Sequence, residues 1–232
     1  ERAVRQHAGQ ERGALSFEVL ASVTRLDLSR RGVVELAGIE QLPNLRRLHL
    51  ADNSLGDKAL AALAPLALLD TLDVASNGLI RVAYLAALRS LRVLILSDNA
   101  ITDITPLAKI TGLEILDLGD NGVSDLSPLR GLRRLRQLNL DNNLVRDVAP
   151  LTALPQLRRV ELSGNPLARS TLSALRQRGV EVTFYAEAMA ISSERVEASI
   201  RKALDRPVGP LDEVDFLRIR ELVISGAIET LG

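Results

Sequence analysis

The residues of this sequence with the most obvious chemistry are aspartates that recur at fixed intervals. Asp98 and Asp120 lie 22 residues apart, and Asp141 follows at nearly the same interval. Carboxylate oxygens are the ligands that calcium prefers, so these three residues form a candidate cation site. A short polar residue in a turn is explained more simply by hydrogen bonds to its own backbone, and we favour this interpretation. A second series is likewise interpreted as turn or capping acids: Asp103, Asp125 and Asp147.

The sequence shows no recognisable catalytic motif. The two histidines, His7 and His49, lie in different parts of the chain, and no pattern places a serine beside either. The sequence has no cysteine, which excludes disulfides, thiol catalysis and cysteine-ligated zinc. It contains neither a phosphate-binding glycine loop nor an H-E-x-x-H motif. We therefore predict a protein that is not an enzyme and that has no cofactor or metal ion.

A repeated pattern, L-x-x-L-x-L-x-x-N-x-L/I/V, positions these residues along most of the chain. Seven copies occur, and the clearest begin at Leu91, Leu113 and Leu135. A fixed period of this length is the signature of a solenoid, in which similar layers stack and share one core. Spacing between pattern asparagines is 22 residues, except for 24 in the second repeat, which contains an insertion. The asparagines are Asn53, Asn77, Asn99, Asn121, Asn143 and Asn165, and Arg31 takes this place in the first copy.

Each repeat is predicted to contain a short strand, such as 92–96, whose residues Leu94 and Leu96 enter the core. The pattern asparagine suits a turn, and stacked asparagines can continue their hydrogen bonds from layer to layer. The returning segment carries a short residue followed by proline, as in Thr105-Pro106, which predicts an N-cap and a short helical or 3-10 turn. The insertion at 57–69 predicts a longer helix.

The pattern resembles that of leucine-rich repeat proteins. Its 22-residue period is similar to the class found in internalin-like bacterial proteins and in regulatory phosphatase-binding subunits, and it covers about 160 of the 232 residues. The resemblance implies an α/β solenoid: a right-handed horseshoe with a parallel sheet on its concave face, short helical or 3-10 convex turns and a helical N-terminal cap. Members of the family usually bind other proteins on the concave face, and the internalin-like class implies a bacterial source.

Three segments are predicted along the chain: a helical N-terminal cap at 1–22, the repeat array at 23–184, and a C-terminal helix and strand at 185–232. The last repeat departs from the pattern, because 171–177 predicts an amphipathic helical turn and 180–184 a final strand. A stack exposes apolar side chains at both ends unless something covers them. We therefore interpret the first segment and this final turn as caps of the array.

The C-terminal segment is similar to the N-terminal cap. Residues 1–29 and 197–225 align without gaps at an offset of 196. Two interpretations stay open: the chain stops as a second array begins, or the copy is a C-terminal cap or a self-association element. A second copy would leave an open strand edge at 220–224, which favours pairing with another chain. By the same alignment Glu1 is expected inside a helix, with the true N-terminus upstream.

The outward residues of the strands are predicted to form columns across the concave face, since adjacent strands lie about 4.8 Å apart. One column runs from Arg25 to Arg159, and another, made mostly of small residues, runs from Ser29 to Ser163. Such small residues would let a helix or loop of a partner approach closely. The central column is Asp27, His49, Asp73, Ile95, Asp117, Asn139 and Glu161.

An apolar patch of Val93, Ile95 and Ile115 is predicted in the middle of this face, with carboxylates around it. An aliphatic cluster with a charged rim is typical of a protein-binding site, although aliphatic residues on a strand also reflect β-propensity alone. The predicted partner-binding residues are Asp73, Val93, Ile95, Ile115, Asp117, Gln137, Asn139, Asp141, Arg159 and Glu161.

Bulk composition limits the class of partner. The net charge is zero, from 29 basic and 29 acidic residues, and only 2% of residues are aromatic. The densest basic stretch, Arg130–Arg136, crosses a repeat junction without aromatic neighbours, and we interpret it as a solvated rim. No apolar run reaches the about 20 residues that span a bilayer. We therefore predict no nucleic-acid partner and no membrane span.

The leading hypothesis is a non-catalytic recognition module that binds a partner protein on the concave face. Two alternatives stay open: a structural or regulatory segment of a larger multidomain protein, and self-association through 197–232. Neither the partner nor the compartment follows from the sequence. The lack of cysteines and of a visible signal peptide fits a cytoplasmic and a secreted or cell-surface protein alike, and the chain begins with Glu1, so a removed leader stays open.

Overall fold

The structure is a computed structural model that describes residue 5 and residues 15–184. The chain divides into two compact units, Glu1–Tyr185 and Ala186–Gly232, and all described residues belong to the first. The C-terminal helix and strand predicted for 185–232, and the self-association predicted for 197–232, lie outside the described residues. Most of the N-terminal cap does so too.

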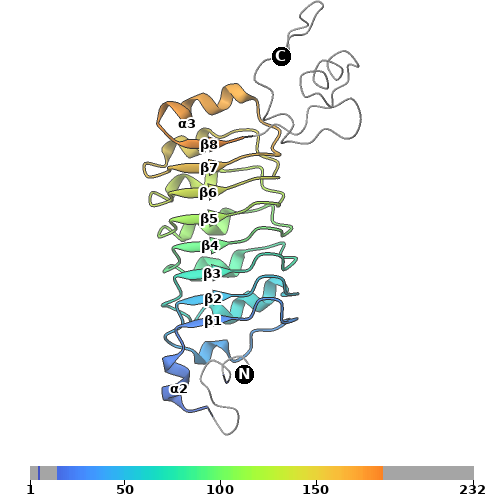
Figure 1. The fold of residues 1–232 in the computed structure, drawn as a ribbon, viewed down its shortest axis with the longest axis vertical. Helices are drawn as coiled ribbons and strands as arrows, with labels where there is room; N and C mark the ends of the chain where they lie inside the picture. Colours follow the sequence, from blue (N-terminus) through green and yellow to red (C-terminus); the bar gives the residue numbers. More distant parts are fainter. Residues whose placement is uncertain (1–4, 6–14, 185–232) are drawn as a thin grey trace, which may run out of the picture. The chain divides into compact units, whose positions relative to one another are not determined.

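Eight strands form one parallel sheet in the order of the sequence, so that each repeat adds one layer (Figure 1). Each strand has three residues, and in the first seven the middle residue is buried between two residues that are at least partly exposed. The strands are β1 (Arg25–Asp27), β2 (Arg47–His49), β3 (Thr71–Asp73), β4 (Val93–Ile95), β5 (Ile115–Asp117), β6 (Gln137–Asn139), β7 (Arg159–Glu161) and β8 (Glu181–Thr183).

The returning segments form short 3-10 helices on the opposite side of the core, as predicted (Figure 1). The insertion in the second repeat produces the longest of them, although it is a 3-10 helix of seven residues and not an α-helix. Residues such as Leu107 and Leu129 point from these helices into the core and are fully buried. The helices are η1 (Ile39–Gln41), η2 (Asp57–Leu63), η3 (Ala83–Ala87), η4 (Thr105–Lys109), η5 (Ser127–Gly131), η6 (Ala149–Ala153) and η7 (Arg169–Leu172).

The prediction that a hydroxyl caps these helices was wrong. Thr105 is the first residue of η4, and the residue before it makes no side-chain cap. Instead Oδ1 of Asp103 accepts the Thr105 N–H at 2.8 Å. The hydroxyl of Thr105 and this N–H both donate to the carboxylate, which lowers the pKa of Asp103. A carboxylate is a stronger hydrogen-bond acceptor than a hydroxyl, so Asp103 rather than Thr105 caps the helix. The capping role of the whole series is confirmed, since Asp125 and Asp147 bind the N–H groups of Ser127 and Ala149 in the same way.

The core is a continuous column of buried leucine, isoleucine and valine, and no aromatic side chain is among the buried residues of the described range. The space between two adjacent layers is small and is the same along the array. Side chains of one size, repeated in register, therefore fill the interior closely. Val23, just before β1, and Val180, just before β8, are both buried. The apolar interior is therefore continuous from one end of the array to the other.

Both ends of the array carry helices. At the start, α2 (Phe17–Ser22) begins with Ser16, whose hydroxyl accepts the Val19 N–H, and Leu20 packs against the core. At the end, α3 (Ser173–Gln177) buries Leu175 over the last layers. A short helix therefore lies at each end of the described array.

The guanidinium of Arg178, just after α3, binds the C-terminal end of the 3-10 helix η6. It donates to the carbonyls of Thr152 at 2.6 Å and Leu154 at 2.8 Å, at the end of η6. Carbonyls at a helix end lack partners within the helix, so a cation that donates to them is well placed.

The pattern asparagines join the layers through their side chains. Asn143 is only 3% exposed. Its Nδ2 donates to the carbonyls of Leu118, Leu140 and Asp141 at 2.8–3.1 Å, and its Oδ1 accepts the Val123 N–H at 2.9 Å. Leu118 and Val123 belong to the preceding layer, so one amide connects two repeats. Equivalent bonds to the preceding layer are made by Asn53, Asn77, Asn99, Asn121 and Asn165.

Replacing Asn143 with leucine should destabilise the array by about 3 kcal/mol, since several buried backbone groups lose their partner and each costs about 1–3 kcal/mol. Urea unfolding followed by circular dichroism measures the change. Asn142→Gly is the matched control, because Asn142 is exposed and its φ of 54° suits glycine. That variant should change stability by less than about 1 kcal/mol. Equal effects of the two substitutions would contradict the role of the ladder.

Candidate protein-binding face

The sheet face that points away from the core consists of the outward residues of β1–β8. The strand register aligns each outward residue with its equivalent in the next strand, for example Val93 with Ile115 and Ile95 with Asp117. The two predicted columns that lie within the strands are therefore confirmed, and β8 extends them by Glu181 and Thr183. We call this surface the sheet face; it is the face that the sequence predicts to be concave.

The three aliphatic residues of the predicted patch do lie together on the sheet face. Val93 and Ile95 are the two outward residues of β4, and Ile115 lies beside Val93 on β5. All three are partly buried by their neighbours rather than fully exposed. Asp73 and Asp117 flank Ile95 in the central column. The patch is thus small, shallow and bordered on both sides by carboxylates.

The central column has an internal function that the sequence did not reveal. Oδ1 of Asp73 accepts the N–H of Ala75 at 3.1 Å, and Oδ1 of Asp117 accepts that of Gly119 at 2.9 Å. Asn139 does the same for the residue two positions on, at 2.9 Å. These bonds close the turns after β3, β5 and β6. Oδ1 of each side chain is therefore engaged, and Oδ2 of Asp73 lies 3.6 Å from Nδ1 of His49.

The small residues beside the central column also have an internal reason. A Cβ added to Gly119 would lie 2.9 Å from Nδ2 of Asn139 and 3.3 Å from Oδ1 of Asp117. The polar side chains of the central column therefore occupy the space above this glycine. We predicted that the small residues of this column leave space for a partner. At Gly119 this space is filled by side chains of the protein itself.

Two of the predicted residues form an ion pair at the C-terminal end of the face. Nη2 of Arg159 lies 2.9 Å from Oε1 of Glu161, and the Arg159 side chain is 49% exposed. A pair this exposed contributes about 0–1 kcal/mol to stability, so both groups can be drawn into contacts with a partner. Gln137, on the neighbouring strand, is exposed.

Asp141 does not lie in the same column as Asp98 and Asp120. Those two residues, like Asn142, have left-handed φ values of 54–55° in the turn before the pattern asparagine. Asp141 precedes this turn and accepts the Ser163 N–H at 2.6 Å. Burial raises the pKa of Asp141, and the nearby carboxylates of Glu161 and Asp120 raise it further. Within the described residues, no group of acids and histidines is arranged to hold a metal ion.

Comparison with known proteins agrees with this geometry. Residues 89–131 match the family described as Leucine Rich repeats (2 copies), and residues 41–64 match a single Leucine Rich repeat. The crystal structure of an internalin C2 from Listeria monocytogenes str. 4b F2365 is 33% identical, with a TM-score of 0.67, over 79% of this chain and 91% of that chain. The chain is an internalin-like leucine-rich repeat protein. Comparison with curated protein sequences finds no match.

A second internalin of the same strain is also similar to this internalin-like chain. The crystal structure of internalin F is 31% identical, with a TM-score of 0.72, over 80% of this chain and 54% of that chain. Leucine-rich repeat proteins typically mediate protein–protein interactions and are typically non-catalytic. No helix in residues 15–184 is long and apolar enough to cross a membrane.

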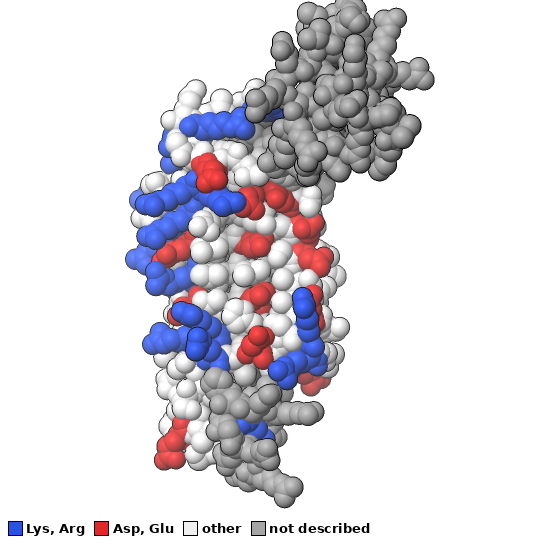
Figure 2. Space-filling model, in the orientation of Figure 1, with Lys and Arg blue, Asp and Glu red and all other residues white. Residues whose placement is uncertain are grey.

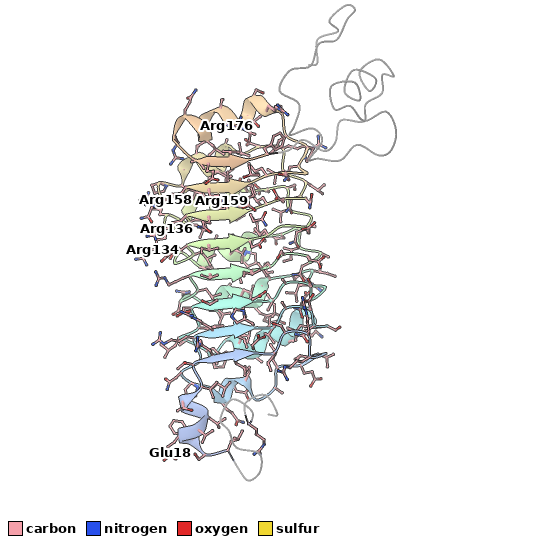
Figure 3. All side chains as sticks on the ribbon, in the orientation of Figure 1. Glu18, Arg134, Arg136, Arg158, Arg159 and Arg176 are labelled. Atoms are coloured by element: carbon pink, nitrogen blue, oxygen red, sulfur yellow. The ribbon has the colours of Figure 1, made fainter. Side chains whose placement is uncertain are left out.

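The sequence missed a basic surface along one edge of this internalin-like sheet. It grouped Arg130–Arg136 as a single solvated stretch, but the structure separates them, because Arg130 lies in η5 on the other side of the core. Arg134 and Arg136 instead join arginines of the next repeat and of α3. Figure 3 labels these residues, and Figure 2 shows basic side chains along the left edge and acidic ones down the middle. We define the arginine edge as Arg134, Arg136, Arg158, Arg159 and Arg176.

The raised pKa of Asp141 predicts a pH-dependent cost to stability. Because its folded-state pKa lies above the ordinary value of 3.8, ionisation disfavours the folded state as the pH rises through this range. Asp141→Asn keeps the acceptor oxygen and removes the charge. Its thermal unfolding midpoint should exceed that of the parent protein at neutral pH, and the difference should disappear below pH 3.8.

Asp103→Asn is the control with the opposite sign. The pKa of Asp103 is lowered by bonds from Thr105, so its ionised form stabilises the fold above the ordinary pKa. This variant should unfold at a lower temperature than the parent protein at neutral pH, with the deficit shrinking as the pH falls below 3.8. The assignment is contradicted if both variants shift the midpoint in the same direction at neutral pH.

Proposed function

We propose that this protein recognises a partner protein on the sheet face, around Val93, Ile95 and Ile115. The observation that supports the proposal most directly is the position of these aliphatic side chains. They point away from the leucine core, on the face opposite to the 3-10 helices, and Val93 is paired with Ile115 across β4 and β5. Burying them under a partner would remove apolar area from water, at about 25 cal/mol for each Å².

The charges around the patch define the partner further. Asp73 and Asp117 each engage one oxygen in a turn, which fixes the direction of the carboxylate. Oriented acceptors beside an apolar patch suit a partner segment that carries an apolar side chain next to a lysine or arginine. Gln137, Asn139, Asp141, Arg159 and Glu161 extend the proposed face toward the C-terminal end.

The alternative of a segment within a larger multidomain protein also stays a proposal. The chain spans about half of the internalin F chain that it matches, at 54% of that length. A longer protein would be expected to present the sheet face either to its own domains or to a separate partner. The two cases predict the same contact surface, so the variants below test both.

The experiment first identifies the partner and then measures affinity. A photo-crosslinking amino acid at Gln137, which is exposed beside Ile115, would attach to whatever covers the patch, and mass spectrometry would identify the attached chain. The double variant Ile95→Glu/Ile115→Glu should then weaken binding to this partner by at least about tenfold, or about 1.4 kcal/mol. Surface plasmon resonance with the isolated partner measures the change.

Matched controls separate recognition from general stickiness and from misfolding. Ile80 and Leu144 are more exposed than the patch, at 58% and 57%, but lie outside the strands. Ile80→Glu/Leu144→Glu should leave binding within about twofold. Ile95→Thr/Ile115→Thr keeps β-branched side chains in the strands and should still weaken binding. The proposal fails if both patch variants, folded by circular dichroism, bind as tightly as the parent protein.

A further inference from the structure

The arginine edge lies where the chain enters β6 and β7. Arg134 and Arg136 precede β6, Arg158 precedes β7, Arg159 begins it, and Arg176 lies in α3. Figure 3 shows Arg134, Arg136 and Arg158 along the same side of the stack. The backbone confirms this order, because the N–H of Arg158 donates to the Arg136 carbonyl at 2.9 Å. The edge therefore repeats positive charge from layer to layer.

One layer earlier, the same position shows how this edge holds a carboxylate. Glu114 precedes β5, and its N–H donates to the Arg92 carbonyl. Nε of Arg92 donates to its Oε1 at 2.7 Å, and Nη1 of Arg136 lies 3.6 Å from Oε2. The carboxylate is thus placed between arginines of the two adjacent layers. The Arg92 hydrogen bond lowers the pKa of Glu114, and Arg136 and Arg134 lower it further.

In the two layers after Glu114, the position equivalent to this acid is occupied by arginine. Arg136 and Arg158 are the equivalents of Glu114 in the two following layers. Arg136 has Glu114 on one side only, and on the other it reaches Gln156 at 3.4 Å. Among the described residues, Arg134 and Arg158 form no ion pair. The edge therefore carries an excess of positive charge, because only Arg136 and Arg159 among its residues at β6 and β7 have a carboxylate partner within the described range, although the whole chain is neutral.

We propose that the arginine edge binds an acidic polypeptide segment. A partner carboxylate would lie between Arg136 and Arg158, beside Arg134, as Glu114 lies between Arg92 and Arg136. Guanidinium groups bind carboxylates with paired, directed hydrogen bonds, which suits this geometry. The edge shares Arg159 with the proposed sheet face but contains none of Val93, Ile95 and Ile115, so this inference does not rest on the function proposed above.

A polypeptide fits this edge better than a nucleic acid does. Single-stranded nucleic acids bind through aromatic platforms as well as positive charge. The exposed aromatic residues of the described range, Phe17 and Tyr84, lie on α2 and η3 rather than on the edge. The edge is also narrow, since the acidic central column runs beside it (Figure 2). A wide polyanion would meet Asp117 and Glu161, whereas an extended acidic peptide can follow the edge alone.

Fluorescence anisotropy with a labelled peptide of alternating glutamate and serine tests the proposal on the full chain. The parent protein should bind the peptide at low ionic strength, and the affinity should fall as salt approaches about 0.15 M. The double variant Arg134→Glu/Arg158→Glu should weaken binding by at least about tenfold, since it replaces two attractions with two repulsions. A peptide of alternating glutamine and serine should not bind.

The control Arg130→Glu/Arg146→Glu changes the net charge equally with exposed arginines outside the edge, and it should bind within about twofold of the parent protein. Equal losses in the two double variants would overturn the proposal, because binding would then depend on net charge alone. An oligothymidylate that binds more tightly than the acidic peptide, with the same dependence on Arg134 and Arg158, would also overturn it. Ile95→Glu/Ile115→Glu should retain peptide binding, which separates this test from that of the sheet face.

Discussion

The asparagine ladder is the interaction on which the rest of this structure depends. Each pattern asparagine is buried or half-buried, and it donates to carbonyls of its own layer and the preceding one and accepts an N–H of the preceding layer, as Asn143 does. The turn after each short strand would otherwise leave these groups buried without partners, at about 1–3 kcal/mol each. The ladder therefore fixes the 22-residue period and the left-handed residue before each asparagine, such as Asp98.

This constraint also decides where the protein can vary. Leucine positions fill a core of constant volume, and asparagine positions close the turns, so neither can change freely. Outward strand residues and the residues just before the strands are less restricted. On the sheet face they combine an aliphatic patch with oriented carboxylates. On the arginine edge they gather arginines, of which Arg134 and Arg158 form no ion pair among the described residues. Two surfaces of opposite charge thus lie side by side on one neutral chain.

The predicted columns of the sheet face were right because a parallel sheet with a fixed period leaves only one register. The roles of residues within those columns were harder to predict. Asp73 and Asp117 were expected to serve only a partner, yet each also holds a backbone N–H two residues on. Thr105 was expected to cap a helix, but Asp103 does so because a carboxylate two residues earlier offers a stronger acceptor. These choices depend on local distances that residue types do not contain.

The sequence by itself determined the solenoid, the order and register of the strands, the inward leucines and the bonds of Asn143 between layers, since all of these follow from one period and the chemistry of each pattern position. Tertiary structure alone decided which charges meet. Glu114 is 22 residues from both Arg92 and Arg136, and only the stacking of layers brings the three together. The same stacking sets Arg136 beside Arg158 with no acid between them, because side chains remote in sequence share an edge only after the layers have formed.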